Sequence, residues 1–375
     1  SGGAVVSAGF AGRNNEQGSE LMAYPRHYLS ARTQFLQQAD SVGLSVRSHA
    51  LKARGPDREV LYIDATVVGE PSPLTLVVNS GVHGPELYAG SACQCALIAA
   101  PPLEGIQLVL VHAINPWGSA HVRRNNENNV DLCRNFTDPE QKSPRNDDYD
   151  ELHERLAVCG AHTPAGRQAK LRLGEMARSW GEKRYNEALL GGQYKHRDGF
   201  AFGGFAPSES RQVLESWLPE LCSGSEHVVL LDLHTGLGSP GKATPISMQS
   251  GAGLATAQGW FGDELIAPVA HAEQVEAQFP RVHGHTTAGH ERLFVQSVVS
   301  LIIEFGTHAH DRITDALLRD HWAEHEDIHP ADKALIKDYL LESFAPADPQ
   351  WMDEVLLAFA DVMKKVVRGI KEMAD

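Results

Sequence analysis

The sequence predicts an α/β protein in which buried strands alternate with helices. Strand patterns and one helical pattern alternate near the start of the chain, at Glu59–Val68, Leu74–Asn79, Glu86–Ala99 and Gln107–Ala113. Two later segments, Val228–Leu233 and Val298–Phe305, are continuous apolar runs, which is typical of strands buried on both faces of a sheet. These observations favour a sheet that is covered by helices on both sides.

The remaining segments are predicted to be mainly helical. Tyr24–Ala39 and Glu151–Leu190 have helical spacing, whereas Asn115–Asp150 is polar and loop-like. Ala243–Met248 has the pattern of another strand, and the chain from Asp311 onward has the pattern of helices. Apolar residues of the last helix recur every three or four positions, at Met352, Val355, Leu356, Phe359, Val362, Met363, Val366, Val367 and Ile370. This stripe predicts a helix that packs against the core.

The composition is that of a globular protein, with 42% hydrophobic and 22% charged residues. No segment has the composition of a linker, so we expect a single domain over residues 1–375, with a mainly helical insertion near residues 137–226. The 33 Lys and Arg against 48 Asp and Glu give a formal net charge of −15, which disfavours nucleic acids and anionic membranes as partners. The opening residues do not have the pattern of a signal segment, and no apolar run approaches the ~18 residues of a membrane span. We expect a soluble, cytoplasmic protein, and homo-oligomerisation stays open.

The residues with metal-binding chemistry are histidines and carboxylates rather than cysteines. The five cysteines form no Cys-x-x-Cys pair and are odd in number, whereas the chain has nineteen histidines. His83 and Glu86 follow the predicted strand Leu74–Asn79 through a turn that contains Gly81 and Gly84. Because α/β sheets place their sites at the carboxyl ends of strands, this pair is a candidate for sharing one metal. Alternatively, it makes turn hydrogen bonds and supplies charge at a helix N-terminus.

Two further candidates end the continuous apolar runs. His234 follows the strand Val228–Leu233 and precedes Thr235-Gly236, where the chain must turn. Two histidines and one carboxylate would leave zinc an open position for water, which is the pattern of catalytic zinc sites. Glu304 ends the second run, and a carboxylate there is costly to bury unless it is paired or acts in chemistry. The alternatives are a histidine satisfied by backbone in the core and a glutamate that faces solvent.

A polar loop adds a local concentration of arginines in this acidic chain. Asn115-Pro116-Trp117-Gly118 precedes Arg123 and Arg124, and the segment Asp131-Leu132-Cys133-Arg134-Asn135-Phe136 follows. Clustered guanidinium groups can bind an anion even where the overall charge is negative. Alternatively, the loop is solvated and its arginines pair with Glu127 and Asp131.

The order of these four motifs resembles that of the zinc carboxypeptidase superfamily, which includes aspartoacylase-like and succinylglutamate desuccinylase-like amidohydrolases. The resemblance covers roughly residues 59–310. It implies a three-layer α/β/α fold with a mixed, mostly parallel sheet of about eight strands and one zinc ion at the strand ends. It also implies that His83, Glu86 and His234 are the zinc ligands and that Glu304 is the general base.

The resemblance implies roles for the loop residues as well. Asp131 would orient the imidazole of His83, and Arg124 would polarise the scissile carbonyl. Arg134, with Asn135 beside it, would bind a carboxylate of the substrate. The implied function is a zinc-dependent hydrolase of a peptide or N-acyl amide bond, carboxypeptidase-like or deacylase-like, whose partner is a small-molecule or peptide substrate with a free carboxylate.

Two departures from the superfamily pattern leave the specificity open. Cys133 stands where carboxypeptidases have Asn, and residues 235–303 contain no tyrosine, although classical carboxypeptidases place a substrate-binding tyrosine there. One alternative is a zinc-binding module without turnover. Another is an inverted zincin, because His321-Trp322-Ala323-Glu324-His325 matches the H-x-x-E-H pattern.

Overall fold

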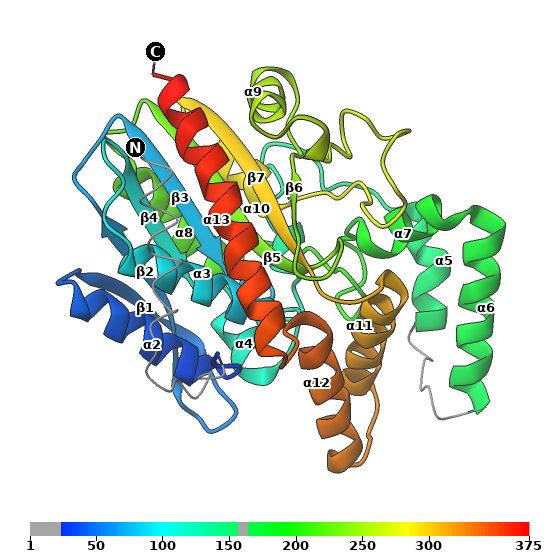
Figure 1. Cartoon of the computed structure of the whole chain (residues 1–375). Coiled ribbons are helices and arrows are strands. Elements are labelled where there is room, and N and C mark those ends of the chain that lie inside the picture. The colour runs from blue at the N-terminus through cyan, green and yellow to red at the C-terminus, as the bar shows by residue number, and fades with distance from the viewer. Residues whose placement is uncertain (1–23, 157–163, 375) are drawn as a thin grey trace.

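The computed structural model describes residues 24–156 and 164–374 and contains a seven-stranded mixed sheet (Figure 1). The strand order is β1-β2-β4-β3-β5-β7-β6. The strands are β1 (Val46–Arg54), β2 (Val60–Val68), β3 (Leu74–Ser80), β4 (Gln107–His112), β5 (His227–Gly236), β6 (Ala243–Ile246) and β7 (Ser297–Gly306). The expected count of about eight strands is therefore slightly too high for the described residues.

The four central strands, β4, β3, β5 and β7, are parallel to one another, so their carboxyl ends meet at one edge of the sheet. The outer pairs β1·β2, β2·β4 and β6·β7 are antiparallel. The apolar runs of β3, β5 and β7 are buried along most of their length, as the sequence predicted. The edge strand β1 was not predicted, because most of its residues are exposed or half-buried and Arg47, Lys52 and Arg54 interrupt its apolar pattern.

Helices cover both faces of the sheet, which gives three layers (Figure 1). On one face, α3 (Leu87–Ala99), α9 (Gly251–Phe261) and α13 (Pro349–Glu372) contribute to the larger apolar core. On the other face, α8 (Glu209–Leu221) supplies Val213, Leu214, Trp217 and Leu218 to a second core, and α10 (Thr286–Glu291) lies against β5 and β7. The stripe predicted for the last helix is buried on α13.

The remaining helices lie around the sheet, and several gather beside the carboxyl ends of β5 and β7 (Figure 1). Those helices are α5 (Asp147–Leu156), α6 (Pro164–Trp180), α7 (Glu182–Leu190), α11 (His310–His325) and α12 (Pro330–Phe344). Residues from this group share a third apolar cluster that includes Tyr149, Leu189, Leu317 and Leu340. The segment predicted as a helical insertion thus contains α5 to α8, but α8 belongs to the layer that covers the sheet.

The first helix and the short helices complete the described chain. They are α2 (Tyr28–Ser41), α4 (Pro116–His121) and the 3₁₀ turns η1 (Gly84–Glu86), η2 (Leu132–Arg134) and η3 (Gly262–Glu264). The segment predicted as a loop therefore contains α4 and η2, which were too short to be recognised from spacing. Among the described residues, no helix combines the length and the apolar character needed to cross a membrane.

Candidate metal centre

Three buried side chains from two neighbouring strand ends converge at the carboxyl edge of the sheet. His83 and Glu86 follow β3 through η1, and His234 lies near the end of β5, the strand that pairs with β3. Each is at most 3% exposed. Gly84 makes the turn possible, because a Cβ there would lie within 2.3 Å of backbone atoms of Gly118 and Arg123. The turn therefore packs against a second loop while it directs both side chains inward.

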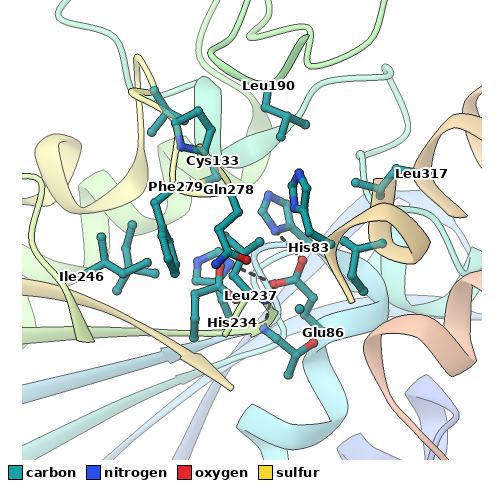
Figure 2. A pocket seen from close by; sticks show the side chains of 18 of the residues that line it. His83, Glu86, Cys133, Leu190, His234, Leu237, Ile246, Gln278, Phe279 and Leu317 are labelled. Atoms are coloured by element: carbon teal, nitrogen blue, oxygen red, sulfur yellow. Dashed lines mark hydrogen bonds and ion pairs between the residues drawn. The ribbon is translucent and has the colours of Figure 1, made fainter. Parts of the chain in front are cut away.

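The donor atoms of these residues face one another (Figure 2). His83 Nδ1 lies 2.9 Å from Glu86 Oε1, and His234 Nδ1 lies 2.9 Å from Glu86 Oε2. Burial raises the pKa of Glu86, but the two imidazoles outweigh it and hold this pKa well below its ordinary value. Two imidazole nitrogens and one carboxylate suit zinc and leave coordination positions open. The residues present therefore fit the ion that the sequence resemblance implied.

The outer nitrogen of His83 is held by Asp131. His83 Nε2 lies 3.0 Å from Asp131 Oδ1, and Arg124 Nε donates to Asp131 Oδ2 at 3.0 Å. Burial raises the pKa of Asp131, but the charges of Arg124 and Arg134 outweigh it and hold this pKa well below its ordinary value. With a proton on Nε2, His83 donates to Asp131 and keeps its Nδ1 lone pair for an ion. Asp131 thus contacts the outer nitrogen of His83 and the guanidinium of Arg124 at once.

Sequence reasoning missed the corresponding partner of His234, which is Asp232. His234 Nε2 lies 3.2 Å from Asp232 Oδ2, and both side chains are buried. Thr286 donates its hydroxyl to the same carboxylate. The signal was present in the sequence, because residues two apart on a strand point to the same face. Cys133 lies close enough to Asp232 and His234 to form a second group of possible metal donors.

Glu304, on β7, lies beside the triad formed by His83, Glu86 and His234. It is the register partner of His234 in the parallel pair β5·β7, so its side chain points to the same side of the sheet. Glu304 Oε2 accepts a hydrogen bond from the backbone N–H of Leu237 at 3.3 Å. Burial, reinforced by the charge of Glu86 and opposed by His234, raises the pKa of Glu304 to about 7. A carboxyl group with this pKa exchanges protons near neutral pH.

Two arginines of the polar loop, Arg124 and Arg134, lie at the site. Arg124 Nη1 lies 3.3 Å from Glu86 Oε1, and Arg134 also lines the cavity beside the triad. Arg134 donates from Nε to Leu190 O and from Nη1 to Cys133 O, both at 2.7 Å. Its Nη2 has no hydrogen-bond partner among the described residues, so one terminal nitrogen remains for a ligand.

Two other predicted loop residues have structural roles in this fold. Asn135 does not line the cavity, because its side chain bonds the backbone of Gly203, Ala206 and Ser208. Arg123 does not line the cavity, because it pairs with Asp320 at 2.9 Å and with Glu324 at 2.8 Å.

The H-x-x-E-H motif on α11 does not form a group of converging metal donors among the described residues. Its glutamate, Glu324, pairs with Arg123, Lys333 and Lys337, and the ring of His321 packs edge-on against Phe200. The carboxylate is therefore engaged by three cations instead of being directed at the two histidines.

A cavity opens from the triad between the end of the sheet and α11 (Figure 2). It encloses about 770 Å³ of empty space, including its open mouth. All three triad residues line it, together with Arg124, Arg134 and Glu304. The proposed metal donors, the carboxyl group of Glu304 and two cations therefore face one space.

Three solved structures illustrate what this chain is similar to. Bovine thrombin-activatable fibrinolysis inhibitor is 11% identical, with 87% of this chain and 98% of that chain covered at a TM-score of 0.43. Murein-tripeptide amidase MpaA from Escherichia coli O157 is 17% identical, with 76% and 93% covered at a TM-score of 0.35. A succinylglutamate desuccinylase from Silicibacter sp. TM1040 is 12% identical, with 76% and 69% covered at a TM-score of 0.37. At these TM-scores, the similarity is loose.

No curated protein matches the sequence of this chain. One family model does match it, over residues 24–358, and its description is a protein of unknown function, DUF2817. The matched region spans the whole sheet and every residue of the candidate metal centre. The chain belongs to the DUF2817 family.

Proposed function

We propose that this chain is a zinc-dependent hydrolase that cleaves a peptide or N-acyl amide bond in a substrate with a free carboxylate. The observation that carries the proposal is the convergence of His83, Glu86 and His234 beside Glu304, in a cavity that two arginines also line. The order of motifs, which resembles that of the zinc carboxypeptidase superfamily, also supports the proposal.

A zinc ion held by the triad would supply Lewis acidity toward a carbonyl oxygen and toward water. Glu304 would accept a proton from the attacking water and return it to the leaving nitrogen. Arg124 would donate to the carbonyl oxygen as negative charge develops on it, since its Nη2 makes no bond to the described residues. Arg134 would hold the substrate's carboxylate through its own Nη2.

The test combines metal analysis with a panel of N-acyl amino acids and short peptides, each compared with its C-terminal carboxamide. We expect one zinc per chain, hydrolysis that is lost on chelation and regained with zinc, and a preference for the free carboxylate. Glu304→Gln should lower kcat about 100- to 10,000-fold while zinc stays bound.

Glu324→Gln is the matched control, because it removes the carboxylate of the α11 motif and leaves the triad intact. It should retain hydrolysis within about twofold. Loss of hydrolysis in Glu324→Gln but not in Glu304→Gln would favour the inverted zincin instead. Stoichiometric zinc without hydrolysis of any panel member would favour the binding module.

A further inference from the structure

The cavity beside the metal centre has two apolar lobes. Ile246, Phe279 and Ile302 form one lobe, on the side of β6, and we call it the β6 lobe. Ile313, Leu317 and Phe344 form the other, which we call the α11 lobe. Figure 2 shows Ile246 and Phe279 on one side of the triad and Leu317 on the other. A bond positioned at the triad would therefore have apolar surface on both sides.

The charges that line the cavity leave a place for only one substrate anion. Arg124 already pairs with Asp131 and Glu86, whereas Arg134 bonds two backbone carbonyls and no carboxylate. The described lining contains no lysine and no other arginine. His310 lines the cavity beside the α11 lobe, and burial lowers the pKa of its imidazole, which favours the neutral form. A second carboxylate placed in either apolar lobe would be buried without a cation, and burial of an unpaired charge is strongly unfavourable.

A cationic side chain would meet the same difficulty. The carboxylates that line the cavity are Glu86 and Glu304, and both belong to the metal centre. Neither lobe contains an acidic residue of its own among the described residues. The lobes therefore offer burial to apolar groups and no compensation to charged ones.

Arg134 lies next to the segment that carries Phe279. The Tyr194 hydroxyl donates to Arg134 O at 2.6 Å and lies 3.3 Å from His283 O, so it connects the two segments. The backbone N–H of Phe136 donates to Gly284 O at 2.8 Å and joins the same segments. Arg134 thus packs against the segment 278–284, whose Phe279 belongs to the β6 lobe.

Resting on the proposed function, we infer the substrate class of this site. The substrate is an amide of an apolar amino acid: its single carboxylate binds Arg134, its apolar side chain fills the β6 lobe, and its acyl half contacts the α11 lobe. Amides of acidic or basic amino acids and dicarboxylic acyl groups are poor substrates, because their second charge would be buried without a partner.

The first experiment measures kcat/KM of the zinc-loaded protein for five substrates. In each of them N-benzoylglycine is joined by an amide bond to one C-terminal amino acid, which is Leu, Phe, Ala, Glu or Lys. We expect the Leu and Phe substrates to exceed the Ala substrate by about 10- to 100-fold, and the Glu and Lys substrates to fall below it. Ile246→Ala should lower kcat/KM for the Leu substrate about tenfold. It should change kcat/KM for the Ala substrate by less than about twofold. Met248→Ala, at a half-buried lining position, tests the same lobe if Ile246→Ala does not fold.

Leu357→Ala is the control for these variants, because Leu357 is an exposed leucine of α13 that does not line this cavity. It should leave all five kcat/KM values unchanged. A preference for the Glu or Lys substrate, or equal use of all five, would overturn the assignment of the lobes.

The second experiment measures binding without turnover, so that the two proposals can fail separately. Calorimetry on the zinc-loaded protein compares 4-methylpentanoate with pentanedioate, which has a second carboxylate where the first has a branched apolar end. We expect 4-methylpentanoate to bind at least about tenfold more tightly, and Arg134→Gln to weaken it by a similar factor. Equal or tighter binding of pentanedioate would reject the substrate class even if amides are hydrolysed. The expected binding without any hydrolysis would reject only the proposed function.

Discussion

Each proposed histidine ligand has a carboxylate at its outer ring nitrogen. Asp131 serves His83, and Asp232 serves His234, at 3.0 and 3.2 Å respectively. Such carboxylates fix the ring orientation and the tautomer of metal-binding histidines. The two carboxylates come from different parts of the chain, Asp131 from the loop after α4 and Asp232 from β5. The contact of Asp131 with His83 has hydrogen-bond geometry, whereas the contact of Asp232 with His234 is a close approach between an imidazole and a carboxylate.

Asp232→Asn and Asp131→Asn should each weaken zinc binding about 10- to 100-fold, because an amide orients the imidazole less well and does not increase its basicity. The measurement is zinc affinity by competition with a chelator. Asp353→Asn, at an exposed position on α13, is the control and should bind zinc as the natural chain does. An unchanged affinity in Asp232→Asn would mean that its contact with His234 does not orient the ring.

Gly84→Ala should destabilise the fold by about 1–3 kcal/mol and weaken zinc binding, because the new Cβ would clash with the backbone of Gly118 and Arg123. Denaturant unfolding and zinc competition measure the two effects. Gly224→Ala is the matched control, since no atom lies within 4 Å of the Cβ it would add. Equal stability of the two variants would contradict the close approach of the two loops.

At the scale of elements, α13 is the helix that most extensively covers one face of the sheet. Its buried residues form a continuous stripe from Trp351 to Ile370, packed with β5, β7, α3 and α9 in the larger core. The indole of Trp351 donates to Gly306 O at 2.8 Å, at the end of β7. The helix is thus tied to the strand that carries Glu304.

Phe359→Ala should lower the free energy of unfolding by about 3–5 kcal/mol, because Phe359 is fully buried and packs edge-on against Phe305 of β7. Leu357→Ala lies two positions away on the same helix and is 63% exposed, so it should change the stability by less than about 0.5 kcal/mol. Urea titrations of both variants give the comparison. Similar losses in the two would be inconsistent with the orientation of α13.

At the scale of the whole molecule, several histidines are buried in their neutral form, among them His112 and His321. Burial lowers the pKa of His112 to about 4, and burial with help from His325 lowers that of His321 to about 3. In the unfolded chain both would titrate near 6.5. At these two positions the unfolded state therefore binds more protons than the folded state below pH 6.5, so the stability that they contribute falls as the pH decreases toward 4.

The prediction is a decline in the free energy of unfolding between about pH 6.5 and 4, to which His112 alone contributes about 3 kcal/mol. Urea titrations at several pH values, with a chelator present so that metal release has no part, measure the decline. His112→Gln should reduce the slope of the free energy of unfolding against pH by the amount that corresponds to about one bound proton. If its slope equals that of the natural chain, His112 is not a neutral, buried group in the folded state.

The sequence was most informative where an apolar run ended in a polar residue. His83, His234 and Glu304 each follow a buried strand, and parallel strands bring such ends together, so local patterns were enough to predict their neighbourhood. Arg123 and Asn135 could not be placed in this way, because their partners Asp320 and Ser208 are 197 and 73 positions away. Their orientation depends on tertiary packing that no local pattern encodes.

The two apolar lobes of the cavity could not be predicted from the sequence either. Ile246, Ile302 and Phe279 come from an edge strand, a central strand and a connecting segment, and nothing in their local patterns indicates that they share a wall. Asp232 was different, since its place two residues before His234 on a strand was sufficient to predict a common face.

The donors of the metal centre are distant along the chain, with Glu86 and His234 separated by 148 positions. An ion bound to both would act as a removable cross-link between β3 and β5, in the middle of the sheet. Because only the folded chain brings the donors together, the melting temperature should rise with the concentration of free zinc. A free concentration about 1,000 times the dissociation constant adds about 4 kcal/mol to the free energy of unfolding. Thermal resistance of this fold would then vary with the supply of the ion.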